Sequence, residues 1–172
     1  VLEITEHIPD RRTHLTRQNL VHLTKIYDLK PYLYSKKIHV KSGVRSQHHP
    51  IIILNTRFAE DPHKLLAALI HEEFHWWALQ NVKNVQAAII ELKRIYPKAP
   101  SKSNSTYLHL IVCHLEVKAL VYYLGKRDAR TTINEIMQRD KIYPWIYYQN
   151  MHKDYAIKKI VKKYRLYPPV LN

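Results

Sequence analysis

Residues 71–75 read His-Glu-Glu-Phe-His, so two histidines stand four residues apart with a glutamate directly after the first. In an α-helix, residues four apart lie on the same face, and both imidazoles can reach one metal ion from adjacent turns. Glu72 lies about 100° further round such a helix, beside the ion rather than on it. There it can take a proton from a zinc-bound water, whose pKa zinc lowers to about 7. The pattern predicts metal-assisted amide hydrolysis with Glu72 as the general base.

Chance is a real alternative, because the sequence contains 12 histidines. The frequencies of His and Glu predict about 0.04 accidental matches to this pattern in a chain of this length. The competing interpretation is a partly exposed polar stripe on an ordinary helix. Context favours the metal site, since burying two histidines and two glutamates in an apolar helix is costly unless something pairs them.

The segment that carries the motif is predicted to be a helix from Asp61 to about Gln80. Asp61 is a capping carboxylate, and Pro62 suits the first helical position. The helix is apolar nearly all round, as expected of a buried central helix. Before it, residues 51–56 begin with a continuous apolar run and are predicted to form a strand covered on both faces. A further strand is predicted at residues 37–41.

The rest of the chain is predicted to be mainly helical. Asp10 caps a first helix, and Gly125 closes a later one as its C-cap. The sequence has only two glycines, which argues against glycine-rich phosphate loops and favours a helix-rich fold. We expect one domain over residues 1–172 of the α+β class, with a small sheet packed on the central helix. The other helices are predicted at about 10–28, 82–96, 107–124, 131–139 and 151–165, the last basic and amphipathic.

The overall charge is strongly positive, with 28 Lys and Arg against 14 Asp and Glu. Such a field attracts polyanions such as nucleic acid, although a solvated lysine-rich surface explains it equally well. Cys113 is the only cysteine, which excludes an intrachain disulfide and a Cys-x-x-Cys metal site. No apolar run reaches the roughly 18 residues that span a bilayer, so no transmembrane segment is expected. The compartment is left open, with a slight preference for the cytoplasm.

His71, Glu72 and His75 resemble the H-E-x-x-H motif of the zincin superfamily of zinc metallopeptidases. The resemblance covers roughly residues 51–124. It implies a zincin-like minimal metallopeptidase fold, Zn²⁺ as the cofactor and a peptide or protein substrate. It also implies that the strand at 51–56 is the sheet edge that pairs with an extended substrate, above the motif helix.

The third zinc ligand separates the zincin subfamilies. The metzincin pattern needs glycine and histidine three and six residues after the second histidine, where this chain has Ala78 and Asn81. The gluzincin arrangement takes a glutamate from a downstream helix, and Glu116 fits, in the middle of an otherwise apolar predicted helix. His109, seven residues earlier on the same face, is its main rival. Two further candidates are His114 and Asp128.

The chain departs from the gluzincin pattern in two ways. Many gluzincins carry an aspartate three or four residues after the ligand glutamate, but Ala119 and Leu120 stand there. The group that orients the first histidine must therefore come from elsewhere. The residue that stabilises the oxyanion or donates a proton is also not unique. Its candidates are His109, Tyr148 and His152, together with Tyr107 and Tyr155.

Other conspicuous residues near the motif are interpreted as structural. Glu73 points away from the metal face, and Trp76 and Trp77 are expected to be core residues. The aromatic cluster at residues 143–148 could line a specificity pocket, but it is expected to cover the core. Cys113 is expected to be a small buried hydrophobe. His48 and His49 could approach the cleft from the loop before the strand, but they are expected to be solvated.

Two alternative functions of other classes are also compatible with the sequence. One is a nucleic-acid-associated basic protein, in which the positive charge does the main work. The other is a non-catalytic zinc-binding regulatory module that keeps the helix without a working cleft. The presence of Glu72 speaks mildly against the second, because structure alone does not require it.

Overall fold

The computed structural model describes residues 2–7, 10–138 and 143–171. The chain divides into two compact units, residues 1–77 and residues 78–172, called here the N-terminal and C-terminal units. The structure is helix-rich α+β with a small sheet, as the sequence predicts. The expectation of a single domain stays a prediction.

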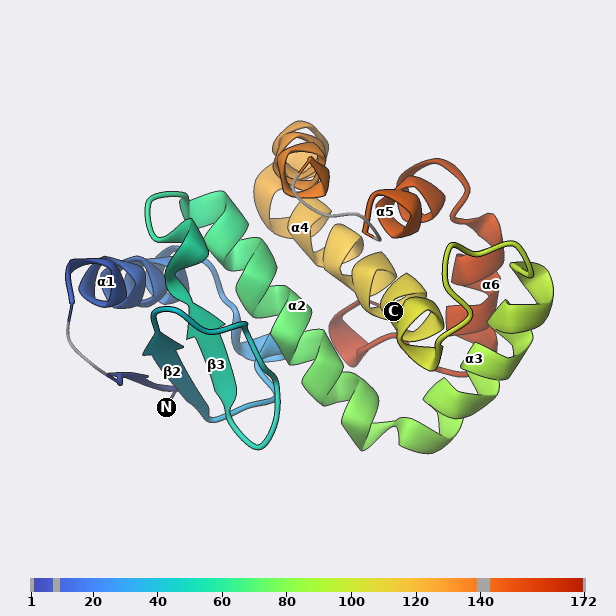
Figure 1. The fold of residues 1–172 in the computed structure, drawn as a ribbon, viewed down its shortest axis with the longest axis horizontal. Coiled ribbons are helices and arrows are strands. Elements are labelled where there is room, and N and C mark those ends of the chain that lie inside the picture. The colour runs from blue at the N-terminus through green and yellow to red at the C-terminus, as the bar shows by residue number, and fades with distance from the viewer. Residues whose placement is uncertain (1, 8–9, 139–142, 172) are drawn as a thin grey trace. The chain divides into compact units, whose positions relative to one another are not determined.

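The sheet of the N-terminal unit has three strands, β1 (Glu3–Glu6), β2 (Lys37–Lys41) and β3 (Ile52–Asn55). They lie in the order β1-β2-β3 and all run parallel, with β2 between the other two (Figure 1). The prediction of β2 is confirmed, and β3 is one residue shorter at each end than predicted. β1 was not predicted. The inward side chains of β2 and β3 are fully buried: Ile38, Val40, Ile52 and Leu54.

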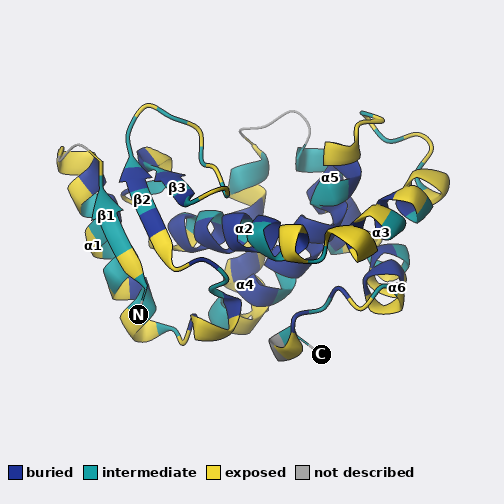
Figure 2. Cartoon of the chain, turned by 90° about the horizontal axis from the view of Figure 1, so that it is seen from below, coloured by how far each residue is buried: buried dark blue, intermediate teal, exposed yellow. Residues whose placement is uncertain are grey.

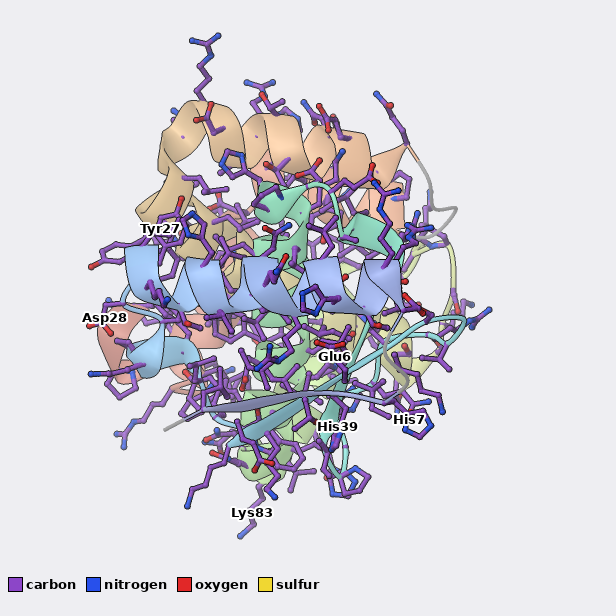
Figure 3. All side chains as sticks on the ribbon, turned by 90° about the vertical axis from the view of Figure 1, so that its left-hand side faces the viewer. Glu6, His7, Tyr27, Asp28, His39 and Lys83 are labelled. Carbon is purple, nitrogen blue, oxygen red and sulfur yellow. The ribbon has the colours of Figure 1, made fainter. Side chains whose placement is uncertain are left out.

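Helix α1 (Arg11–Ile26) connects β1 to β2, the usual way to join two parallel strands. Its N-terminus has the predicted cap, because the Asp10 side chain accepts hydrogen bonds from the backbone N–H groups of Arg12 and Thr13. At the end of β1, Glu6 lies beside α1 and pairs with His14 at 3.4 Å and Arg17 at 3.8 Å (Figure 3). These contacts attach the short strand β1 to the helix.

Helix α2 (Pro62–Gln80) carries the motif and follows β3 after the short 3-10 helix η2 (Thr56–Phe58). Asp61 caps it as predicted, with its Oδ1 accepting a hydrogen bond from the backbone N–H of Lys64 at 3.0 Å. Most of the helix is buried, as Figure 2 shows. Its fully buried apolar residues are Leu65, Leu66, Leu69, Ile70 and Phe74. The prediction of a buried motif helix is confirmed.

The outer edge of β3 is already occupied at its centre. Ile53 forms an isolated antiparallel bridge with Gln47, in which each backbone N–H donates to the other's carbonyl at 2.8 and 2.9 Å. The zincin resemblance implies that this edge pairs with an extended substrate. β3 is an edge strand, but the chain's own loop takes the hydrogen bonds of Ile53.

The C-terminal unit is helical, with α3 (Val82–Ile95), α4 (Asn104–Met137), α5 (Tyr143–His152) and α6 (Tyr155–Lys163) (Figure 1). α4 contacts each of the other three helices. Two short 3-10 helices complete the described chain, η1 (Lys30–Tyr32) in the first unit and η3 (Pro169–Leu171) in the second. The core of this unit includes Leu92, Leu110, Leu115, Leu120, Ile146, Ile157 and Ile160.

Gly125 interrupts α4 rather than ending the helical region. Its φ of 76° and ψ of 164° are non-helical, which a glycine adopts without strain, and helical residues continue on both sides. The helix predicted at 131–139 therefore begins directly after Gly125, and residue 139 lies outside the described residues. The predicted start of the helix at 151–165 was wrong. Residues 151 and 152 belong to the end of α5, and the separate helix α6 begins at Tyr155.

By length and composition, α4 is also apolar enough to cross a membrane. Half of the relevant window is buried within the structure, and core helices of soluble proteins meet the same criterion. The finding is therefore weak evidence for a membrane span.

Candidate metal centre

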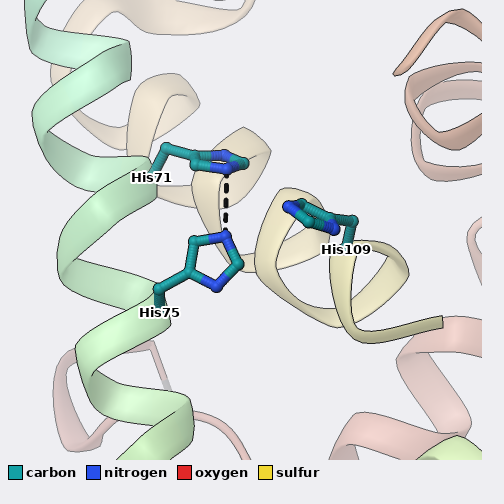
Figure 4. Close-up of side chains that lie close together, drawn as sticks. All are labelled: His71, His75 and His109. Carbon is teal, nitrogen blue, oxygen red and sulfur yellow. Dashed lines mark hydrogen bonds between the residues drawn. The ribbon is translucent and has the colours of Figure 1, made fainter. Parts of the chain in front are cut away.

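His71 and His75 face each other from adjacent turns of α2. Their Nε2 atoms are 3.2 Å apart, and the ring centroids are 4.9 Å apart with the planes at 70° (Figure 4). His75 is only 6% exposed, whereas His71 is half-buried. The two rings thus converge on one point, as the four-residue spacing predicts.

The separation of the two nitrogens fits a shared zinc ion. Zn–N bonds of 2.0–2.1 Å in tetrahedral geometry place two ligand nitrogens about 3.3 Å apart. The observed 3.2 Å is close to that value. Two neutral imidazoles can also share one N–H···N hydrogen bond at this distance. The two nitrogens would therefore need to move little if a cation bound between them in place of the shared proton.

Glu72 is buried next to the histidine pair. Its Oε2 lies 3.5 Å from Nδ1 of His48, which is the nearest charged or polar partner found for it among the described residues. The carboxylate is therefore not consumed by a strong ion pair with lysine or arginine. A general base needs this condition, because a tight lysine or arginine partner would compete with the substrate water for the carboxylate.

His48 lies beside the motif, although the sequence favoured a solvated position for it. Its ring stacks on His75 with centroids 4.5 Å apart and planes at 15°, while its Nδ1 approaches Glu72. It lies in the loop before β3, where a solvated histidine is the ordinary expectation. The Gln47–Ile53 bridge fixes the preceding residue against the strand and so aims His48 at α2. This contact depends on pairing between separate segments, which no local pattern encodes.

The two tryptophans after the motif anchor neighbouring loops. Trp76 donates its indole N–H to the carbonyl of Tyr34 at 2.8 Å and packs against His49. Trp77 lies against the Tyr34 ring at 5.1 Å. These contacts give both residues a structural role, although they are half-buried rather than fully in the core.

Glu73 is structural, as predicted. Its carboxylate is 1% exposed and accepts hydrogen bonds from the backbone N–H groups of Tyr34 and Ser35 and from the Ser35 hydroxyl, at 2.7 to 2.9 Å. Burial raises the pKa of Glu73 to about 7, and these hydrogen bonds oppose the shift. The side chain joins the motif helix to the segment that leads into β2.

In the C-terminal unit, Glu116 lies in α4 and is only 1% exposed. The hydroxyl of Tyr147, from α5, lies 2.9 Å from both of its carboxylate oxygens and donates to them. Burial raises the pKa of Tyr147 well above its usual range, and the charge of Glu116 adds to this. Tyr147 therefore orients Glu116, whereas the sequence predicted only that its aromatic cluster covers the core.

Cys113 lies one turn before Glu116 and is fully buried. Burial raises the pKa of its thiol well above the usual range, with Glu116 adding to the shift. A protonated, inaccessible thiol is not a nucleophile. The expectation of a small buried hydrophobe is confirmed.

His109 has its tautomer fixed by the backbone. Its Nδ1 lies 2.7 Å from the carbonyl oxygen of Ser105, which can only accept, so Nδ1 carries the proton. The lone pair is then on Nε2. Metal-ligating histidines commonly donate the other ring N–H to a backbone carbonyl in this way. His109, drawn in Figure 4, thus has the electronic arrangement of a ligand.

The remaining candidates have other contacts. His114 is buried and hydrogen bonded to the Tyr167 hydroxyl at 2.9 Å, and burial lowers its pKa to about 4. The Tyr107 hydroxyl donates to the carbonyl of Tyr96. The other candidates lie at the surface. They are Tyr148 and His152, whose rings pack together at 5.0 Å, the highly exposed Tyr155, and the exposed Asp128.

The described residues contain side chains that could hold a metal ion, and His71 and His75 are among them. The donor set does not fix the identity of the metal. Comparison with protein-family models, with curated proteins and with solved structures gives no match. The resemblance to zincins therefore rests on the motif and on the geometry of its two histidines.

Proposed function

We propose that this chain is a metal-dependent hydrolase, most simply a zinc peptidase, in which His71 and His75 hold the ion. The observation that carries the proposal is the 3.2 Å separation of their Nε2 atoms, with Glu72 buried beside them. Neutral imidazole nitrogens suit zinc among the common divalent cations, although they also bind other transition metals.

A bound Zn²⁺ would supply Lewis-acid polarisation of a substrate carbonyl and would make water more acidic. Glu72 would accept the proton of the attacking water and pass it to the leaving amine. His48, 3.5 Å from Glu72, would restrict the rotation of that carboxylate. The stacking of His48 on His75 would also hold the second imidazole in its orientation.

The third ligand is proposed to come from α4, where Glu116 is the leading candidate and His109 its rival. Glu116 is supported by its burial and by Tyr147, and His109 by its fixed tautomer.

The test is the substitution Glu72→Gln in the full chain. The amide keeps the shape of the side chain but cannot accept the proton, so we expect hydrolysis of fluorescein-labelled casein to fall by about a thousandfold or more. Bound zinc, measured by atomic emission, should remain at the level of the unsubstituted protein. Full activity in the variant would remove Glu72 as the base and with it the proposed reaction.

One observation favours a non-catalytic zinc-binding module as the second candidate. The edge of β3 that a peptide would use is hydrogen bonded at Ile53 to Gln47. This candidate predicts zinc binding without hydrolysis of any peptide. The assay of casein hydrolysis and bound zinc distinguishes it from the peptidase. For a non-catalytic module, Glu72→Gln would change neither the hydrolysis nor the zinc content.

A polyanionic partner is supported by the distribution of charge. Residues 78–172 contain 17 Lys and Arg against six Asp and Glu, a difference of +11 out of the chain's +14. Charge concentrated in one unit is what a nucleic-acid-associated protein would need. This candidate predicts DNA binding that weakens steeply with salt, and no binding at low salt would exclude it.

A further inference from the structure

The C-terminal unit contains two adjoining hollows along α4 that the proposed hydrolase does not use. One measures about 460 Å³ and the other about 300 Å³. They share three lining residues, Val117 and Val121 of α4 and Asn150 of α5. The first also has His114, Lys118, Tyr122, Asp154 and Leu171 in its wall, and the second has Lys126, Ala129, Arg130, Ile133, Met151 and His152.

Two of the three residues that the hollows share are apolar. Val117 and Val121 lie one turn apart on α4, and Ile133 and Met151 extend this surface in the second hollow. An apolar wall with a few convergent polar groups is the usual composition of a small-molecule site. The combined space is large enough for a ligand of two fused or linked rings.

Asn150 gives the hollows a specific polar feature. It is 4% exposed, and its Nδ2 donates to the carbonyls of Ile146 at 3.1 Å and Leu110 at 3.3 Å. Its Oδ1 has no hydrogen-bond partner among the described residues. His114 lies close enough to Asn150 for that side chain to raise the pKa of His114, opposing the effect of burial, but its ring does not reach Oδ1 with the distance and angle of a hydrogen bond. A buried acceptor without a donor is energetically costly, and a ligand with an N–H or O–H group would recover that cost.

The charges at the two ends of the space differ. In the first hollow, Lys118 is accompanied by Asp154. In the second, Lys126 and Arg130 are both exposed cations, and none of the described residues that line it is acidic. The second end is therefore suited to an anionic group, held by a lysine and by an arginine that can bind it bidentately.

We propose that this groove of α4 and α5 binds a small organic anion that has an apolar body and an N–H donor. Its anionic group would contact Lys126 and Arg130, its body would lie on Val117 and Val121, and its N–H would donate to Oδ1 of Asn150. N-acylated amino acids and short peptides with a free carboxylate belong to this chemical class. The site is independent of His71 and His75, so it does not rest on the proposed hydrolase.

The probe is 1-anilinonaphthalene-8-sulfonate, which combines two aromatic groups, one N–H and one sulfonate. Titration into the folded full chain should give a saturable increase in fluorescence with one site per chain. The double substitution K126E/R130E should weaken this binding about tenfold or more, since two attractive charges become repulsive. Both residues are exposed, so circular dichroism should show an unchanged fold.

A matched control changes the net charge equally without touching the groove. K159E/K162E alters two exposed lysines of α6 and should change the affinity by less than about twofold. The N-methylated form of the probe lacks the donor and should bind the unsubstituted chain about fivefold or more weakly, since a buried unpaired acceptor is costly. Equal weakening by both charge variants, equal affinity for both probes, or a signal that does not saturate would each overturn the proposal.

Discussion

The contact between Tyr147 and Glu116 offers a sharp test of the C-terminal unit. The substitution Tyr147→Phe removes only the hydroxyl, which lies 2.9 Å from both carboxylate oxygens of Glu116. The ring remains, so the core around α5 keeps its volume. The change therefore isolates a hydrogen bond to a buried carboxylate.

The expected loss of stability follows from the burial of both partners. Tyr147 and Glu116 are almost completely inaccessible, so water cannot replace the missing donor. A hydrogen bond to a charged group contributes about 1.5–3 kcal/mol, and the desolvated carboxylate left behind pushes the cost toward the upper end. We expect the free energy of unfolding to fall by about 2–3 kcal/mol.

Urea denaturation followed by circular dichroism measures this loss. Tyr148→Phe is the matched control, since Tyr148 is the next residue of the same helix and is 47% exposed. It should change the free energy by less than about 0.5 kcal/mol. Equal stability of the two variants would refute the assigned contact. If Glu116 is a zinc ligand, Tyr147→Phe should also lower zinc affinity by about 10–100-fold, whereas His109 as the ligand predicts no such loss.

Two further predictions concern buried polar groups. Burial lowers the pKa of His114 from its usual 6.5 to about 4, so the buried neutral ring favours the folded state fully above pH 6.5. This stability is lost as the pH falls from 6.5 toward 4, by up to about 3 kcal/mol. His114→Gln should flatten the curve of unfolding free energy against pH in that window, and an unchanged curve would contradict the burial of His114. Ser35→Ala removes the 2.7 Å hydrogen bond to Glu73 and should lower the free energy of unfolding by about 1–2 kcal/mol in urea denaturation, and no loss would mean that Glu73 does not depend on this donor.

Elements with local signals were predicted well from the sequence. Asp61 and Pro62 mark the start of α2, and Asp10 marks the start of α1 through its capping box. Both signals consist of a side chain that satisfies backbone groups within three residues. β2 was found with its observed bounds because its apolar residues alternate.

Elements that depend on distant partners were missed. β1 has four residues, and its hydrogen bonds come from β2, more than 30 residues later. α5 is rich in tyrosine and lacks a clear apolar stripe, so its helical period is hidden. Pro144, at the second position of α5, is a start signal that could have revealed it.

The candidate site divides in the same way. His71, Glu72 and His75 follow from their spacing on one helix, and the facing imidazoles agree with it. His48 and Tyr147 act through contacts with residues 24 to 31 positions away, which no spacing rule supplies. A motif on one helix can be predicted from the local sequence, but the side chains that orient its residues come from distant segments that only the tertiary fold places beside it.

The central claim is that His71 and His75 together bind a divalent cation. Calorimetric titration of the metal-free chain with Zn²⁺ tests it directly. His75→Ala is the variant, and His63→Ala, which changes an exposed histidine of the same helix, is the control. We expect about one zinc per chain in the unsubstituted protein and in the control, and a loss of affinity of about 100-fold or more in His75→Ala. Equal zinc affinity in all three proteins would contradict it.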